Sequence, residues 1–418
     1  MTTSGSPWGL LTARGKVFAV LGVLLVVAGT FLGYEDVTRV GLALLLLPVL
    51  VLLLMPRRPP RLTVSREVTP QRLTPEERGK VEVRFRNVGA RSAVYLAEEH
   101  LDYQLGDRPR YILPRMSTGE ERRLRYTVRS RHRGAYALGP IVLRQRDPFG
   151  LTFRTLHLSS RTELLVLPRV VSLGDDRLRG SSRGSEGEMP QMIALQGEDD
   201  VSIRSYRDGD ELRRVHWPAT AHRGELMVRQ EDRPARRRAV LLLDSRADAH
   251  PGTGMRASYE WAVSAIASVA RHLVADGFVV HLLADETLRD GSAEHQVELG
   301  PLMDTLARVQ PEEDARLDRV TAAASSFTSG GVLLIAAVVA HDDAALRSLA
   351  SVRQPGSRAL AFVLDPARFG ADQGGSSATD RPTGVLADAG WRTVTVGSHT
   401  ELAQAWVSLR QAALGRSA

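Results

Sequence analysis

The sequence predicts a chain of α/β plus β class, with an N-terminal hairpin of two transmembrane helices, a small β-sandwich and a C-terminal doubly wound α/β domain. Three observations carry this prediction. Two long apolar runs lie near the N-terminus, short segments of alternating polarity follow, and continuous apolar runs then alternate with helical stretches. The expected parts are a cytoplasmic N-terminus at 1–16, the hairpin at 17–56, the sandwich at 57–168, a linker at 169–196, a motif-bearing segment at 197–236 and the α/β domain at 237–418.

The two apolar runs predict a membrane hairpin. Val17–Phe31 and Val40–Met55 are joined by a short turn that contains Glu35 and Asp36. Each run is a little short of the roughly 20 residues that cross a bilayer, but flanking residues complete both. A buried core helix would show polar residues at helical spacing, and a cleaved signal peptide would need a small-residue cleavage site that is not evident here.

Basic residues flank the outer ends of both runs. Arg14 and Lys16 precede the first run, and Arg57, Arg58 and Arg61 follow the second. The positive-inside rule therefore places both ends in the cytoplasm. We expect a bacterial inner-membrane protein whose two N-terminal helices insert into the lipid bilayer and whose soluble parts are cytoplasmic.

Composition excludes several classes of function. The 418 residues contain no cysteine, which removes disulfides, thiolate metal sites and cysteine nucleophiles, and fits a reducing compartment. The formal net charge is +7, but the 55 basic residues are interspersed with 48 acidic ones. A surface that follows nucleic-acid phosphates would need clustered basic side chains, so no nucleic-acid partner is expected.

Alternating segments after the hairpin predict the β-sandwich. Leu62–Ser65, Val81–Phe85, Leu124–Val128 and Ile141–Leu143 each place apolar side chains at every second position. That period is typical of half-buried antiparallel strands.

Two glycine- and proline-containing stretches in this region predict tight connections. They are Arg133–Pro140 and Asp147–Leu151, and we expect Phe149 to plug the sandwich core. The alternative is that one of these loops binds a partner, because conformationally fixed loops also carry recognition.

The segment after a Gly- and Ser-rich linker is the most informative in the chain. Asp208-Gly209-Asp210 reads as a turn in which Asp210 pairs with Arg213 or Arg214, and Tyr206 and Trp217 are expected to pack on either side. One interpretation is a purely structural turn locked by carboxylate–guanidinium bonds. The other is a recognition surface, for which the candidate partner-binding residues are Arg204, Tyr206, Gly209, Asp210, Arg213 and Trp217.

Apolar runs beyond this segment predict a parallel sheet buried on both faces. The runs are Ala239–Leu243, Phe278–Leu283, Val332–Val339, Ala359–Leu364 and Thr393–Val396. Helical stretches are expected between or after them near Tyr259–Ala275, Pro301–Val309, Asp343–Val352 and Glu401–Ala413. This alternation is typical of a doubly wound fold.

The motif segment resembles the signature of the family called domain of unknown function 58. The matching positions are Arg204, Tyr206, Gly209, Asp210, Arg213 and Trp217, while Pro218 and His222 depart from the usual pattern. The resemblance also takes in the two apolar runs and the Arg133 and Asp147 stretches. It implies association with a MoxR-type AAA+ ATPase, often beside a transglutaminase-like membrane protein.

The α/β domain resembles a von Willebrand factor A domain, because its first strand ends in Asp244. Such domains hold a divalent metal with Asp-x-Ser-x-Ser, but Arg246 and Asp248 stand at the two serine positions here. An arginine opposes a hard cation that needs oxygen ligands, so we expect no cofactor, with Asp244 and Asp248 only weak candidates for Mg²⁺ or Ca²⁺. The favoured interpretation is that Asp244 caps a helix or pairs with an arginine.

These expectations lead to a non-enzymatic scaffold or adaptor. No Ser/His/Asp or paired-carboxylate arrangement can be assigned from the spacing, so no catalytic residue is expected. The alternative function is a metal-dependent ligand- or protein-binding module of the von Willebrand type.

Overall fold

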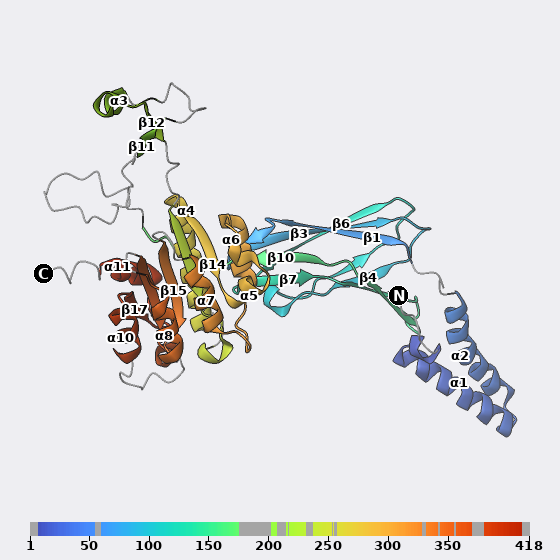
Figure 1. Cartoon of the computed structure of the whole chain (residues 1–418). Coiled ribbons are helices and arrows are strands. Elements are labelled where there is room, and N and C mark those ends of the chain that lie inside the picture. The colour runs from blue at the N-terminus through green and yellow to red at the C-terminus, as the bar shows by residue number, and fades with distance from the viewer. Residues whose placement is uncertain are drawn as a thin grey trace, which may run out of the picture. The chain divides into compact units, whose positions relative to one another are not determined.

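The chain divides into two compact units. The structure is a computed structural model (Figure 1), and it describes residues 7–54, 60–174, 202–206, 215, 217–230, 237–252, 254, 257–327, 332–341, 343–354, 357–369 and 380–411. The first unit comprises Met1–Arg169 together with Met303–Val309. The second comprises Val170–Leu302 and Gln310–Ala418.

Two apolar helices open the first unit, and both are long and apolar enough to cross a membrane. They are α1 (Ala13–Leu32) and α2 (Glu35–Leu54), which pack against each other over their length (Figure 1). Gly22 and Gly41 allow this close approach, because a Cβ at Gly22 would lie 2.9 Å from the carbonyl oxygen of Gly41. The outward side chains are apolar and exposed, as expected of helices that face lipid.

Ten strands form three small sheets in the first unit. One sheet has the order β1 (Leu62–Thr69), β3 (Arg78–Asn87), β6 (Glu121–Arg129). The second has the order β5 (Arg110–Leu113), β4 (Tyr95–Glu99), β8 (Ile141–Arg146), β9 (Phe153–Leu158). The third has the order β2 (Arg72–Leu73), β10 (Thr162–Val166), β7 (Gly134–Leu138).

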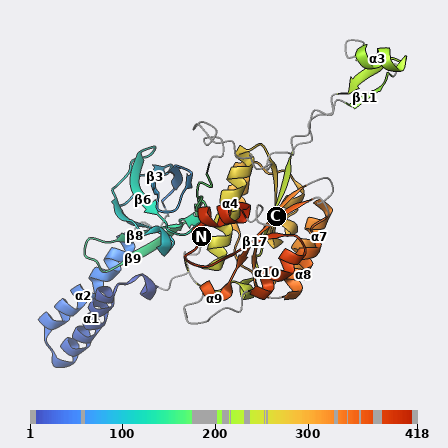
Figure 2. The same cartoon turned by 90° about the vertical axis from the view of Figure 1, so that its left-hand side faces the viewer.

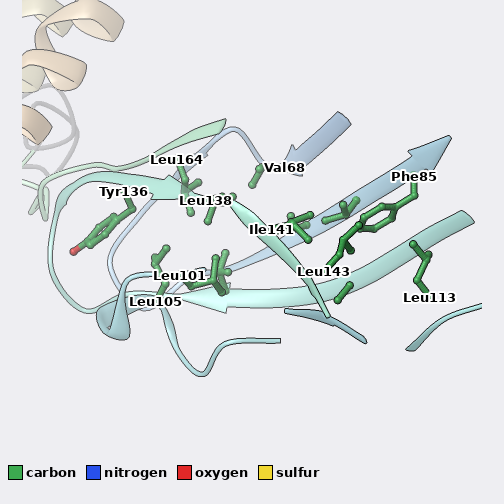
Figure 3. Close-up of a cluster of buried hydrophobic side chains, with 14 of the residues drawn as sticks. Val68, Phe85, Leu101, Leu105, Leu113, Tyr136, Leu138, Ile141, Leu143 and Leu164 are labelled. Carbon is green, nitrogen blue, oxygen red and sulfur yellow. The ribbon is translucent and has the colours of Figure 1, made fainter. Parts of the chain in front are cut away.

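One hydrophobic core joins these sheets, and Figure 3 shows part of it. Alternation along β3 buries Val81, Val83 and Phe85 completely while their neighbours face outward. Leu138 and Leu143 reach the same core from β7 and β8 (Figure 3). The four alternating segments singled out in the sequence all form strands.

A fully buried ion pair also lies in this unit. The Arg66 Nε donates to the Glu99 carboxylate, and Arg66 Nη1 donates to the carbonyl oxygen and hydroxyl of Ser160 at 2.9 Å each. A Cβ at Gly139 would lie 2.6 Å from Arg66 Nη2, so the chain can pass here only because that residue is glycine.

The second unit contains a five-stranded parallel sheet. Its order is β14 (Val279–Leu283), β13 (Arg238–Leu243), β15 (Leu333–Val339), β16 (Arg358–Leu364), β17 (Arg392–Val396). This 2-1-3-4-5 order is a doubly wound arrangement, in which the strand order reverses between β13 and β15. The five apolar runs of the sequence are these five strands.

Helices cover both faces of the parallel sheet (Figure 1, Figure 2). One face packs against α7 (Leu317–Phe327), α8 (Asp343–Ser351) and α10 (Asp380–Asp388). The other packs against α4 (Ser258–Ala275) and α11 (Leu402–Gln411), where Trp261 and Trp406 lie beside Phe362. Further helices are α5 (Asp285–Arg289), α9 (Pro366–Phe369) and α6 (Leu299–Arg308), whose residues 303–308 belong to the first unit.

Candidate functional site

The motif segment forms a small hairpin with one helix. Strand β11 (Ser202–Ser205) pairs antiparallel with β12 (Met227–Gln230), and α3 (Trp217–Arg223) lies between them in sequence. Val215, Met227 and Val228 are buried and give this element its core. Gly209, Asp210 and Arg213 lie outside the described residues, so the expected pairing of Asp210 with an arginine is not placed.

Three candidate partner-binding residues do lie in this hairpin. Arg204 belongs to β11 and stands opposite Val228, and the backbone N–H of Tyr206 donates to the carbonyl oxygen of Leu226 at 2.8 Å. Trp217 opens α3 with 67% of its surface exposed. The turn beside which Trp217 was expected to pack, residues 208–210, lies outside the described residues, so that expectation stays a prediction.

Asp244 occupies the reversal point of the parallel sheet. It follows β13 directly and is buried, and its Oδ2 accepts from the backbone N–H of Val339, the last residue of β15, at 3.2 Å. Ligands of doubly wound sheets bind beyond the carboxyl ends of strands at such reversal points. Asp244 thus lies at the place in the sheet where folds of this kind bind ligands.

The guanidinium of Arg246 binds both carboxylate oxygens of Asp244, which in a metal-binding domain would be available to a divalent cation. Arg246 Nε donates to Asp244 Oδ1 at 2.9 Å, and Arg246 Nη2 donates to Asp244 Oδ2 at 2.8 Å. The arginine side chain is only 12% exposed and the aspartate side chain is fully buried. A two-bond pair of this kind compensates the buried carboxylate, so the pairing favoured from the sequence is confirmed.

The other metal candidate is Asp248. Asp248 is exposed in a short 3-10 helix, Ala247–Ala249. Within the described ranges, no group of three or more histidine or acidic side chains is placed to hold a metal ion. The groups that contact the Asp244 carboxylate are N–H groups of Arg246 and Val339. Protonated nitrogen groups cannot coordinate a hard cation, which needs oxygen ligands.

His250 and Ser258 lie beside Asp244 but do not form a catalytic triad with it. His250 Nε2 is 2.8 Å from the backbone carbonyl oxygen of Asp244, so this nitrogen carries the proton, and Nδ1 is 2.9 Å from Ser258 Oγ. A triad needs the carboxylate at the imidazole and an accessible hydroxyl. Here the carboxylate is bound by Arg246, and Ser258 is completely buried.

Burial controls the protonation of His250. Burial is the largest influence and lowers the pKa of the imidazole, outweighing the opposite effect of Asp244. The ring also meets Tyr259 edge to face, with ring centroids 5.1 Å apart. His250 is therefore a neutral structural link between the end of β13 and the start of α4.

Arginines neutralise two further aspartates at the same edge of the sheet. Asp285 lies just after β14 and forms two salt bridges. Arg289 Nε is 3.2 Å from its Oδ2, and Arg319 Nη1 is 3.7 Å from its Oδ1. Asp365 lies directly after β16, and Arg368 Nε is 3.1 Å from its Oδ2. Both carboxylates are nearly buried, whereas their arginines are about half exposed. The edge thus presents guanidinium groups whose charge is already balanced.

Arg133 has a role that the sequence did not reveal. This buried side chain caps the end of α6, where Nη1 donates to the carbonyl oxygens of Leu306 and Val309 at 2.7 Å each and of Ala307 at 3.3 Å. A guanidinium satisfies helix carbonyls that have no partner within the helix and also favours the negative end of the helix dipole. Met303–Val309 belongs to the first unit, so Arg133 holds that segment within its own unit.

The Asp147–Leu151 stretch also differs from its prediction. Phe149 does not plug the core but is 61% exposed, because the stretch forms the tip of the β8–β9 hairpin. Gly150 adopts a left-handed φ of 68°, and the backbone N–H of Phe149 donates to Asp147 Oδ1 at 2.8 Å. These local bonds direct the phenyl ring outward.

Comparisons with known proteins identify one family match. The model of the family described as "Protein of unknown function DUF58" matches residues 202–324, a stretch that includes the small hairpin and the first two strands of the parallel sheet. Among curated proteins, no match is found.

Similarities to solved structures are weak. The CARDB domain of the PF1109 protein from Pyrococcus furiosus is 16% identical, with 26% of this chain and 91% of that chain covered and a TM-score of 0.19. The alkylpurine DNA glycosylase AlkC of Pseudomonas fluorescens is 12% identical, with 32% and 38% covered and a TM-score of 0.19. The sporulation control protein Spo0M of Bacillus subtilis is 13% identical, with 25% and 49% covered and a TM-score of 0.15.

Proposed function

We propose that this chain is a membrane-anchored, non-enzymatic adaptor that binds a partner protein through its motif hairpin. The observation that carries the proposal is Trp217, an indole with 67% of its surface exposed at the start of a seven-residue helix, in a hairpin whose core residues Val215, Met227 and Val228 are buried. Tryptophan and arginine are the residue types that dominate interface hot spots.

The partner that we propose is a MoxR-type AAA+ ATPase, as implied by the resemblance of the motif. Arg204, Tyr206, Gly209, Asp210 and Arg213 are proposed to complete the surface around Trp217, and a transglutaminase-like membrane protein is a further proposed member of the assembly. The match of the DUF58 family model to residues 202–324 supports the choice, because it contains the whole motif hairpin.

We also propose that the α/β domain is a degenerate von Willebrand factor A-like domain. The position of Asp244 at the reversal point of a doubly wound sheet supports this. In this proposal, the Arg246 guanidinium replaces the divalent cation. The alternative function, a metal-dependent binding module, is not supported by the groups around Asp244, because the Arg246 guanidinium occupies its carboxylate.

The location that we propose is the bacterial inner membrane, with residues 62–418 in the cytoplasm. Exposed Arg14 and Lys16 at the start of α1 support this orientation, and Arg57 and Arg58 lie outside the described residues. An alkaline phosphatase reporter fused after Ala418 should be inactive. Strong periplasmic activity of that fusion would overturn the orientation.

The binding proposal is tested with the full chain and a purified MoxR-type AAA+ ATPase. Trp217→Ala should weaken binding by about 30-fold in Kd, which corresponds to the roughly 2 kcal/mol typical of a hot spot, while leaving the melting temperature unchanged. Tyr103→Ala is the matched control, since Tyr103 is an aromatic residue with 85% exposure in the other unit. Equal affinity of both variants would contradict the proposal.

A second variant separates docking from a structural role. If Arg213 only locks the turn through a buried pair, Arg213→Ala should lower the free energy of unfolding by roughly 3–5 kcal/mol. If Arg213 docks the partner, the melting temperature should stay nearly constant while binding is lost. Normal binding by folded Arg213→Ala and Trp217→Ala variants would leave the motif a purely structural role.

A further inference from the structure

The tip of the β8–β9 hairpin is fastened to the first turn of the apolar helix α1. Thr12, which caps α1, donates from its backbone N–H to the carbonyl oxygen of Leu151 at 2.9 Å and from its hydroxyl to that of Gly150 at 2.7 Å. Leu11 forms an antiparallel bridge with Thr152. The tip therefore lies at the end of α1 where the helix begins.

A close backbone approach tightens this junction. A Cβ at Gly15 would lie 2.2 Å from the carbonyl oxygen of Leu151, so only glycine fits in this turn of α1. Gly15 is buried, and its N–H donates to the hydroxyl of Thr12 at 3.1 Å. Helix and hairpin tip meet here backbone to backbone.

The tip is also fixed internally by Asp147. Its Oδ2 accepts from the hydroxyl of Thr152 at 2.9 Å and from the backbone N–H of the same residue. Burial acts to raise the pKa of Asp147, but hydrogen bonds from Thr152, Phe149 and Leu151 outweigh it, so the pKa is lowered and the carboxylate stays charged. The loop needs no ordering step before it binds another surface.

Exposed aromatic and basic side chains gather around this junction. Phe149 at the tip is 61% exposed, and Trp8, in the 3-10 helix Pro7–Leu10 directly before α1, is 54% exposed. Arg14 and Lys16 are exposed in the first turn of α1, and Arg146 is exposed at the end of β8. Aromatic rings with basic neighbours are the side chains that proteins place at a membrane–water interface.

We propose that the β8–β9 tip and the Trp8 helix dock into the headgroup layer of an anionic leaflet, with Phe149 and Trp8 inserted as interfacial anchors. This inference rests on the proposed membrane anchor, because it assumes that α1 spans the bilayer. Given that span, the start of α1 lies at the membrane surface, and the bonds from Thr12 bring the tip to the same depth. Arg14, Lys16 and Arg146 then face the phosphates of anionic lipids.

The absence of native cysteine makes a direct depth measurement possible. The full chain carries a single cysteine as Phe149→Cys, labelled with the fluorophore NBD, in vesicles of phosphatidylethanolamine and phosphatidylglycerol. Tyr103→Cys serves as the aqueous control, because Tyr103 is 85% exposed and lies beside Gln104, which bonds to Tyr136 rather than to the α1 junction. Leu24→Cys, on the outward face of α1 with 59% exposure, serves as the lipid control.

The proposal predicts a blue-shifted emission at position 149, quenching by lipids that carry a nitroxide near the headgroup, and loss of the iodide quenching seen at position 103. Iodide quenching at 149 equal to that at 103, with no quenching by lipid nitroxide, would overturn it. The control at position 24 distinguishes failure of interfacial docking from failure of the membrane anchor. If position 24 is quenched by lipid but 149 is not, interfacial docking fails alone, whereas loss of lipid quenching at 24 means that the membrane anchor itself fails.

Discussion

The guanidinium of Arg246 makes two parallel hydrogen bonds to the carboxylate of Asp244, at 2.9 Å and 2.8 Å, at the point where the order of the parallel strands reverses. Since the aspartate is buried, removal of the arginine leaves a charge without compensation. Arg246→Ala should therefore lower the free energy of unfolding by roughly 3–5 kcal/mol in a urea titration followed by tryptophan fluorescence.

A matched control for this prediction is an exposed pair in the same unit. Arg316 Nη2 lies 3.2 Å from Asp318, and both side chains are well exposed. Arg316→Ala should change the free energy of unfolding by under ~1 kcal/mol. A small effect for Arg246→Ala, comparable with that of Arg316→Ala, would show that the Asp244 pair does not stabilise the fold.

The same pair makes a prediction about metal. The full chain should have the same melting temperature in Mg²⁺ as in EDTA, because the guanidinium already occupies the oxygen atoms of Asp244. Differential scanning calorimetry checks this. A rise in melting temperature with Mg²⁺ that disappears in Asp244→Ala would contradict the expectation.

A pH dependence follows from His250. Its pKa is lowered in the folded chain, chiefly by burial, from the ordinary value of 6.5. Below about pH 6.5 the unfolded chain therefore binds a proton that the folded chain does not, and stability falls as the pH drops toward the folded pKa. His250→Gln keeps a donor for the Asp244 carbonyl but does not titrate, so it should lose less stability than the wild type over this range.

His281 provides the background for that comparison. Its pKa is also lowered by burial, so it contributes a pH dependence of the same sign to both proteins. The difference between wild type and His250→Gln isolates His250 because His281 remains in each. Parallel stability curves from pH 7 to about pH 5 would show that His250 takes no part.

Gly15 and Gly9 form a matched pair for testing the junction at the start of α1. A Cβ at Gly15 would lie 2.2 Å from the Leu151 carbonyl oxygen, whereas nothing lies within 4 Å of a Cβ at Gly9. Gly15→Ala should cost about 1–3 kcal/mol by overpacking and should raise hydrogen exchange in residues 147–152. Gly9→Ala should leave the exchange in that loop unchanged. Equal exchange in the two variants would mean that the loop is not held by α1.

Arg133→Ala tests the cap on α6. Hydrogen bonds from a charged donor are worth about 1.5–3 kcal/mol, so the loss of the cap should lower stability by about that amount. The effect should appear as faster hydrogen exchange at the end of α6, near Val309. Arg131→Ala is the control, because Arg131 is 71% exposed and lies 3.8 Å from Glu76. Slow exchange at that helix end in Arg133→Ala would refute the capping role.

The pattern of apolar residues predicted the strands of the parallel sheet well, because a strand that is buried on both faces is a continuous apolar run in the sequence. Ala239–Leu243 and Val332–Val339 are continuous apolar runs, and both form buried parallel strands. The helices Leu317–Phe327 and Asp380–Asp388 were missed. Small and polar residues dominate both, so the apolar signal over so few turns is weak.

Side-chain roles were harder to predict than elements. The Phe149 prediction was wrong because the direction of a loop side chain depends on the bonds of Asp147 and Gly150, which an apolar residue does not reveal. Arg133 was missed because the carbonyls that it binds lie 173 to 176 residues further along the chain. An ion pair between Asp244 and an arginine was predicted, and the partner, Arg246, stands only two positions further along the chain.

The order in which the chain is synthesised has a consequence for the first unit. Its last segment, Met303–Val309, is separated from Arg169 by more than a hundred residues that belong to the other unit. Domains generally fold as they leave the ribosome, N-terminal parts first. Arg133 must therefore remain without its helix carbonyls until translation has passed Val309. The first unit is thus completed only after β13 and β14, two of the five strands of the parallel sheet, have been made.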